Sequence, residues 1–116
     1  MQVTAAIEKS YHGKDEKGFV YNIAASFPAF EGHFKGHPLL PAVCQLGLCT
    51  HAVGKMTGKK MELSGVKRAK FIRPILPDTS VRVELTPRED MEFAAVLLHT
   101  VTGEKFSQIT FSVKEF

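Results

Sequence analysis

His33 and His37 stand four residues apart in a stretch, residues 30–41, whose glycines and prolines predict a loop. Residues 42–54 contain no proline and are mostly apolar or small, which predicts a buried helix. Imidazole titrates near neutral pH, so it can accept or give up a proton under physiological conditions. The first turn of a helix carries N–H groups without intrahelical partners and the positive end of the helix dipole. A histidine loop that enters such a helix is therefore predicted to be a reaction centre.

The helix that starts after Pro41 should be covered on more than one side. Proline suits the first turn of a helix, because its missing N–H costs no hydrogen bond there. The apolar residues in and just before the helix form a surface wider than one stripe; they are Leu39, Leu40, Val43, Leu46 and Leu48. Gly58 and the lysines beside it are typical of a helix C-terminus.

The rest of the chain reads as strands joined by turns. Strands are predicted at residues 2–10, 19–27, 63–72, 79–86, 92–100 and 105–113. The first of them alternates poorly, and a bulge is predicted near Gly65. This order predicts an α+β fold, in which one long helix lies against one face of an antiparallel sheet. No repeat or linker interrupts the chain, so residues 1–116 are predicted to form a single domain.

Length and composition are typical of one domain with a modest core. The chain has 116 residues, of which 44% are hydrophobic, and a domain of this size is marginally stable unless it also buries surface in an oligomer. No apolar run is long enough to span a membrane, and the first residues lack the apolar core of a signal peptide. Cys44 and Cys49 point in different directions on the predicted helix, which predicts two reduced, buried thiols and a cytoplasmic protein.

Basic residues cluster between residues 55 and 73, where seven lysines and arginines stand against the single acid Glu62. This patch favours an acidic partner, although a solvated face that keeps the protein soluble would look the same. No nucleic-acid motif is present, so a nucleic-acid partner is not expected. His33 and His37 lack a matching third ligand and no phosphate-binding glycine loop occurs, so neither a metal nor a cofactor is expected.

Two segments resemble a known family. HFKGHPLLPAV, residues 33–43, resembles the H-F-P-G-x-P-x-x-P-G-V signature of 3-hydroxyacyl-[acyl-carrier-protein] dehydratases. VKRAKFIRPILPDTSVRVEL, residues 66–85, is similar to a later strand pair of that family, in the right order and at about the right separation. The resemblance implies the hotdog fold, a sheet wrapped round one central helix. It also implies dimers that join edge to edge, with active sites at the dimer interface, and the dehydration of 3-hydroxyacyl thioesters.

The resemblance assigns roles to individual residues. His33 matches the base that removes the C2 proton, and the N–H of Ala42, where the family has glycine, would bind the thioester oxygen. The acid, which the family takes from the other subunit, falls on Gly47, which has no side chain. The residues predicted to bind the substrate are His37, Leu40, Ala42, Val43 and Gly47. His12 and His99 are predicted to lie on a turn and a strand and are assigned no role.

Three interpretations of the missing acid are open. His51, one helical turn beyond Gly47, can substitute and act as a second catalytic residue. Alternatively, His33 or His37 alone shuttles the proton from C2 to the hydroxyl. In the third interpretation the chain binds acyl thioesters without turning them over, and a second hotdog subunit supplies the acid. A hotdog thioesterase is a further alternative, but it would need a carboxylate near the helix, and none occurs between Glu31 and Glu62.

The glycine at position 47 has two explanations. One is close packing of the helix against the sheet, because a mid-helix glycine costs about 1 kcal/mol relative to alanine and needs a reason. The other is a wider acyl tunnel that admits a bulky or rigid chain, such as a polyene or aryl acyl group. Fatty-acid biosynthesis and polyene-type lipid biosynthesis are therefore both open. Gln45 is a further polar residue of the helix that could face the thioester.

The resemblance also gives the basic patch a role. Acyl carrier proteins are acidic, and Lys67, Arg68 and Arg73, together with Lys59 and Lys60, are predicted to dock one. A coenzyme A thioester is the alternative form of the substrate. The assembly is expected to be a homodimer or larger, or a pair with a second kind of hotdog subunit.

Overall fold

The computed structural model describes residues 3–31, 36 and 38–116, so His33 and His37 lie outside the described residues. The N-terminal part contains helix α1 (Val3–Ser10), strands β1 (Tyr11–Lys14) and β2 (Phe19–Ile23), and the short 3-10 helix η1 (Pro28–Phe30). The long helix α2 (Ala42–Thr57) follows. Four strands complete the chain: β3 (Met61–Phe71), β4 (Thr79–Pro87), β5 (Glu92–His99) and β6 (Lys105–Glu115).

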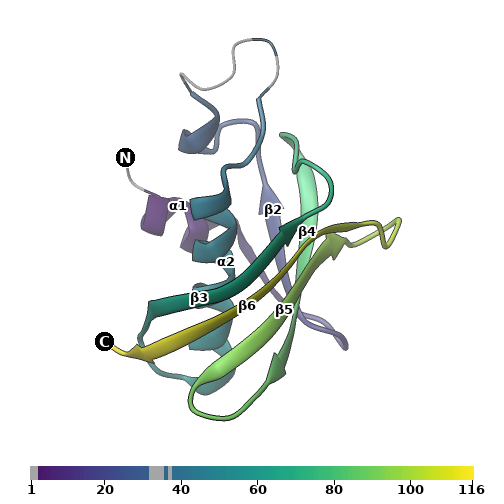
Figure 1. The fold of residues 1–116 in the computed structure, drawn as a ribbon. Coiled ribbons are helices and arrows are strands. Elements are labelled where there is room, and N and C mark those ends of the chain that lie inside the picture. The colour runs from purple at the N-terminus through teal and green to yellow at the C-terminus, as the bar shows by residue number, and fades with distance from the viewer. Residues whose placement is uncertain (1–2, 32–35, 37) are drawn as a thin grey trace.

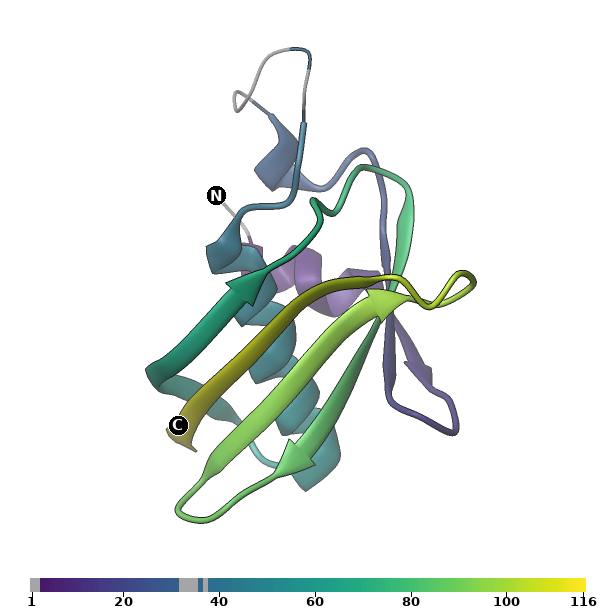
Figure 2. The ribbon, with the colours of Figure 1, turned by 45° about the vertical axis from the view of Figure 1, so that its right-hand side comes forward.

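The strands form one antiparallel sheet that curves round α2 (Figures 1 and 2). Their order is β1-β2-β4-β5-β6-β3, so β1 and β3 are its edges. The chain thus has the predicted α+β class, and a sheet wrapped round one central helix is the hotdog architecture that the resemblance implied. The predicted bulge near Gly65 is confirmed, because the pairing of β3 with β6 shifts register between Leu63 and Gly65.

The core lies between the inner face of α2 and the concave face of the sheet. The residues that α2 buries there are Cys44, Gln45, Leu48, Cys49, Ala52 and Val53. They meet alternate residues of β2, β4, β5 and β6, such as Tyr21, Val83 and Phe111, all fully buried. Burying one large apolar side chain stabilises a fold by roughly 1.5–3 kcal/mol, so this contact holds α2 to the sheet. Cys44 and Cys49 are buried and unpaired, as predicted.

Helix α2 continues one turn past residue 54, where the predicted helical stretch ended. It closes at Gly58, which confirms the C-terminus that Gly58 and its neighbouring lysines predicted. Gly58 adopts the left-handed conformation, with φ 74°, and its N–H donates to the carbonyl of Gly54 at 2.8 Å. A residue without a Cβ takes this conformation at no steric cost.

The prediction of a first strand at residues 2–10 is wrong, because residues 3–10 form α1. Val3, Ala6 and Ile7 pack against the core at helical spacing, which overrides the weak strand pattern. The first strand instead lies at Tyr11–Lys14 and includes His12, which was predicted to lie on a turn. The strand predicted at 19–27 is also too long, because β2 ends at Ile23 and the chain then leaves the sheet for η1.

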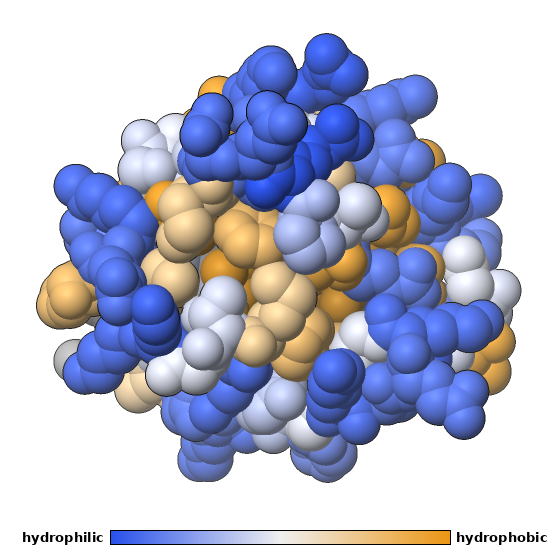
Figure 3. Space-filling view, turned by 90° about the horizontal axis from the view of Figure 1, so that it is seen from below, coloured by the Kyte–Doolittle hydropathy of each residue, from blue (hydrophilic) through white to orange (hydrophobic). Residues whose placement is uncertain are grey.

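Seen from below, apolar residues gather at the centre of the molecule and hydrophilic residues surround them (Figure 3). This end holds the C-terminal turn of α2 and the connection between β4 and β5 (Figure 1). Among the described residues, no helix combines the length and apolar character needed to cross a membrane.

Candidate active site

The start of α2 offers backbone donors. Pro41 is the residue before the helix, with φ −63° and ψ 156°, and no side chain caps the helix there. The N–H groups of Cys44 and Gln45 both donate to the carbonyl of Pro41, at 3.0 and 3.2 Å. Among the described residues, no group accepts a hydrogen bond from the N–H of Ala42 or Val43. These two donors therefore point outward at the positive end of the helix dipole, where they can bind a negatively charged oxygen.

A small pocket lies beside these donors. Its volume is about 290 Å³, and Leu39, Leu40 and Ala42 line it on one side and residues 71–74 on the other. Three residues that the sequence singled out, Leu40, Ala42 and Arg73, meet in this pocket, and Gln45 lines it as well. The pocket thus joins the backbone donors, an apolar wall and one positive charge.

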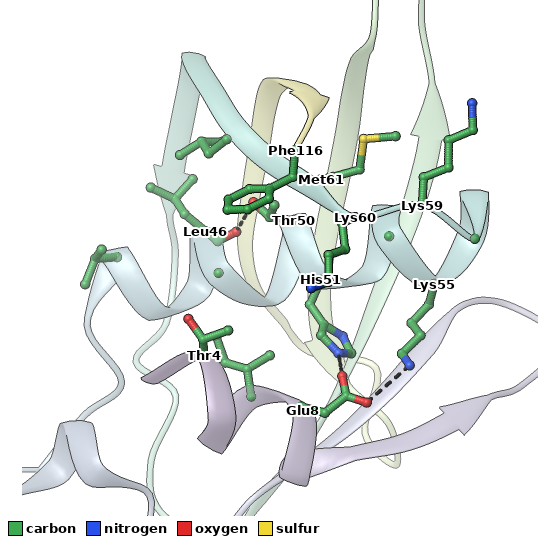
Figure 4. A pocket seen from close by; sticks show the side chains of 16 residues that line it. Thr4, Glu8, Leu46, Thr50, His51, Lys55, Lys59, Lys60, Met61 and Phe116 are labelled. Atoms are coloured by element: carbon green, nitrogen blue, oxygen red, sulfur yellow. Dashed lines mark hydrogen bonds and ion pairs between the residues drawn. The ribbon is translucent and has the colours of Figure 1, made fainter. Parts of the chain in front are cut away.

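A larger groove runs along the outer face of α2 (Figure 4). Its volume is about 790 Å³, and α1 forms one wall, while the start of β3 and Phe116 form the other. Val43, Gly47 and His51, which the sequence also singled out, all line it. Lys55, Lys59 and Lys60 stand at the end of the groove where the helix ends. Helix α2 is covered on more than one side, as predicted, by the sheet and by α1, but the face along the groove is open and Val43 there is 69% exposed.

Gly47 is the point where α1 packs on α2. A Cβ at position 47 would lie 2.6 Å from Cδ1 of Ile7, far closer than two carbon atoms can approach. The glycine therefore allows close packing, as one of the two explanations held, although the partner is α1 rather than the sheet. The space that the missing side chain leaves is filled by Ile7, a residue of the hydrophobic core.

His51 is held by hydrogen bonds at both ring nitrogens. Nδ1 lies 2.7 Å from the hydroxyl of Tyr21, and Nε2 bonds to the carboxylate of Glu8 (Figure 4). A carboxylate accepts hydrogen bonds only, so Nε2 carries a proton toward Glu8. In the neutral imidazole Nδ1 then accepts from Tyr21, whose pKa is raised by burial so that its hydroxyl stays protonated. His51 thus links β2, α2 and α1.

Glu8 is the residue of this site that sequence reasoning missed. It comes from α1, accepts hydrogen bonds from His51 and from Nζ of Lys55 at 3.2 Å, and lines the groove. The hydrogen bond from His51, followed by that from Lys55, lowers the pKa of Glu8 below its ordinary value. Residues 2–10 were predicted as a strand, and that prediction did not place the side chain of Glu8 beside α2. The spacing of Val3, Ala6 and Ile7 was the signal that would have placed Glu8 on the helix edge beside α2.

Replacing Glu8 by Gln should remove a stabilisation that depends on pH. A folded-state pKa below the ordinary value means that the carboxylate stabilises the fold above that ordinary value, and that this contribution disappears as the pH falls through the folded-state pKa. The melting temperature of the wild type should therefore exceed that of Glu8→Gln at pH 7, and the difference should vanish in strong acid. Glu16→Gln, an exposed change on the β1–β2 turn, is the control. A gap that stays constant with pH would contradict the expectation.

The predicted docking residues lie on one edge of the sheet. Lys67 and Arg68 belong to β3, are exposed, and follow one another at the second register shift of this strand. Lys67 forms an ion pair with Glu92 at 3.7 Å, and Arg73 forms one with Glu104 at 3.4 Å. Both cations are exposed, and ion pairs of this kind contribute little to stability, so the cations remain available to an acidic surface.

Comparisons with known proteins place the chain among dehydratases. The family model described as ApeI dehydratase matches residues 9–110. The 3-hydroxyacyl-[acyl-carrier-protein] dehydratase FabZ of Haemophilus influenzae is 35% identical over 97 residues, which cover 73% of this chain. The chain spans 64% of the length of that relative. FabZ of Clostridium acetobutylicum is 29% identical over an alignment of 124 residues, which covers 97% of this chain and 87% of the relative.

Solved structures share the fold. A chain of the dehydratase heterocomplex ApeI:P from Xenorhabdus doucetiae superposes with a TM-score of 0.70 at 20% identity, covering 82% of this chain and 83% of that one. An uncharacterized protein from Erwinia carotovora gives a TM-score of 0.68 at 24% identity, covering 92% and 91% of the two chains. At these identities the likeness establishes the architecture alone.

Proposed function

This chain belongs to the ApeI-like dehydratase family, and from that premise we propose that it removes water from 3-hydroxyacyl thioesters to give trans-2-enoyl thioesters. The observation that carries the proposal is the open start of α2. Two backbone N–H groups there have no acceptor among the described residues, one of them belongs to Ala42 beside the pocket, and His33 precedes this helix by nine residues in the sequence. A dehydratase needs such donors next to a base, because the substrate develops negative charge on its thioester oxygen.

His33 and the start of α2 carry out different parts of the reaction. His33 takes the C2 proton, and the electrons of that C–H bond move toward the thioester carbonyl, whose oxygen becomes negatively charged. The N–H of Ala42 donates a hydrogen bond to this oxygen. The electrons then return to form the C2–C3 double bond, the C3–O bond breaks, and the hydroxide leaves with a proton from a general acid. Because hydroxide is a poor leaving group, a missing acid typically costs about 10²–10⁴ in rate.

We propose that a second hotdog chain supplies this acid. Gly47 cannot, and His51 lies nine residues beyond Ala42, which is about 13 Å along a helix. C1 and C3 of the substrate are only two bonds apart, so the His51 of the same chain cannot serve a thioester held at its own Ala42. Strand β3 supports the pairing of two chains, because it is an edge strand of 11 residues. The acid is then the His51 of a second copy, or a carboxylate of a different hotdog subunit, as the heterocomplex of the X. doucetiae neighbour suggests.

One assay tests these proposals. The pure chain is incubated with a 3-hydroxyacyl thioester and separately with the 2-enoyl thioester, while enoyl absorbance and free thiol are followed. Interconversion of the two supports the dehydratase. Thiol release would instead identify a thioesterase, an alternative that Glu8 favours because it brings a carboxylate to the helix beside His51. Binding without turnover, with activity restored by a second hotdog chain that has a carboxylate on its central helix, would show that the acid comes from outside.

Reversing the charge of Lys67 and Arg68 should raise the KM for a substrate carried on an acyl carrier protein. Both residues are exposed on β3, and an acidic carrier that docks there would lose two attractive contacts and gain two repulsive ones. The KM for a short soluble thioester should stay the same, because that substrate does not touch the docking surface. Steady-state kinetics of the Lys67→Glu/Arg68→Glu variant with both substrates measure the difference. Equal effects on both substrates would refute carrier docking at this edge.

A further inference from the structure

Two polar side chains in the core are bonded to each other. Ser10, Gln45 and Ser107 are the buried polar residues among those that the structure describes. Gln45 on α2 is 4% exposed and Ser107 on β6 is fully buried, and the hydroxyl of Ser107 donates to Oε1 of Gln45 at 2.8 Å. Replacing both partners of such a bond by apolar groups of the same shape costs almost no stability. Stability therefore does not explain why a polar pair occupies this place.

The other end of the Gln45 amide reaches Leu40, two residues before the helix begins. Because Ser107 donates to Oε1, the NH₂ group of Gln45 faces the carbonyl of Leu40 and donates to it at 3.4 Å. Leu40 is also held from its other side, since its own N–H donates to the carbonyl of Ile75 at 2.8 Å. The backbone of Leu40 is therefore fixed on both sides, just before α2 begins.

Two neighbouring residues of β6, Phe106 and Ser107, anchor the two walls of the small pocket. Ser107 holds the Leu40 side through Gln45, and the carbonyl of Phe106 accepts hydrogen bonds from the N–H groups of Ile72 and Arg73, at 2.8 and 3.2 Å. Leu40, Gln45, Ile72 and Arg73 all line this pocket together with Ala42. The position of the N–H of Ala42 relative to the opposite wall thus depends on the link from Ser107 to Gln45.

We propose that Gln45 and Ser107 are positioning residues that hold the start of α2 in register with β6. In this role they fix the N–H of Ala42 beside the pocket between the two walls. That a thioester oxygen binds there rests on the proposed function, whereas the register itself does not. A shift of about 1 Å in such a donor can lower a rate by up to about 100-fold, which gives the pair a reason to be polar.

The double variant Gln45→Leu/Ser107→Ala separates position from stability. It replaces both partners by apolar groups, so its melting temperature should stay within roughly 3 °C of the wild type. Amide hydrogen exchange and ¹⁵N chemical shifts, measured by NMR on the chain without ligand, should nevertheless change at Leu40, Ala42 and Val43. In the dehydration assay kcat should fall about 10- to 100-fold, while KM changes less than twofold, because the substrate still binds along the same walls.

Ser10→Ala is the matched control. Ser10 is the third buried polar residue, and its hydroxyl donates to the carbonyl of Ile7 at 2.7 Å, away from the start of α2. This variant should lose the same kind of hydrogen bond without a change in kcat or in the amide signals of Ala42 and Val43.

The outcomes are distinct. If the double variant keeps the wild-type amide signals, the positioning role is wrong whatever the enzyme does. If the signals move but kcat stays at the wild-type value, the register is held by the pair but is not used in catalysis, which also overturns the proposal. A wild type that dehydrates nothing would refute the proposed function alone, because the amide signals of the variants would still report on the link between Ser107 and Gln45.

Discussion

Replacing His33 by Ala should lower kcat for dehydration by about 10²–10⁴, because the reaction loses the base that removes the C2 proton. The described residues that supply the donors at the start of α2 and the pocket beside them are unchanged in this variant, so the dissociation constant for a 2-enoyl thioester should change little. Enoyl absorbance gives the rate, and calorimetric titration gives the affinity. If the enzyme needs a second hotdog chain for turnover, both measurements are made with that chain present.

His12→Ala is the control for this prediction. His12 is exposed on β1, and its replacement removes an imidazole of the same kind from a place outside the groove and the pocket. We expect the wild-type rate from it. A His33→Ala enzyme that is as fast as the wild type would eliminate the proposed mechanism. A variant that loses affinity as well as rate would show that His33 binds the substrate and is not the base that removes its proton.

The contact between Ile7 and Gly47 should appear as a strong coupling between two substitutions. Gly47→Val forces a side chain into the space that Ile7 fills, and overpacking of this kind costs about 1–3 kcal/mol. Ile7→Ala leaves a cavity and should cost about 2–5 kcal/mol. Combined, the new valine fills part of that cavity, so the double variant should be more stable than the sum of the single losses predicts, by about 0.5–3 kcal/mol. Urea denaturation of the four proteins measures the cycle.

Gly65→Val provides the comparison for this cycle. A Cβ at position 65 would meet no atom within 4 Å, and β3 is a strand, which valine favours. This change should cost little and should not couple to Ile7→Ala. Additive losses for Ile7 and Gly47 would mean that α1 moves freely on α2, and the account of position 47 as a packing site would then be wrong.

The strands β3 to β6 were predictable because their patterns are strong. The alternation of residues 79–86 and the short turns between the later strands predict that β4, β5 and β6 pair in chain order. The pairing of β3 with β6 instead of β4 leaves no local pattern. Helix α2 was predictable from its apolar residues, and Gly58 with the lysines beside it predicted the C-terminus. Only the last turn was left open, and the hydrogen bond from Gly58 back to Gly54 shows that this turn is helical.

The N-terminal segment was not predictable in the same way. The residues with which α1 lines the groove could therefore not be predicted either. Eight residues make a helix that is marginal by itself, so α1 forms because Ile7 finds the gap at Gly47. A contact between residues forty positions apart leaves no local pattern. The same applies to Gln45, whose orientation depends on Ser107 in the last strand. His33 and His37 were found from the sequence, and their roles stay predictions because they lie outside the described residues.

The cluster around His51 also determines how the protein can be observed. The chain contains two tyrosines and no tryptophan, and the rings of Tyr11 and Tyr21 lie 5.3 and 5.5 Å from the ring of His51. The ultraviolet emission of this protein therefore comes from a single spot, where α1, α2 and β2 meet, instead of averaging over many sites. A change in that emission reports directly on whether α1 is seated, so the opening of this one contact can be timed in the unlabelled protein.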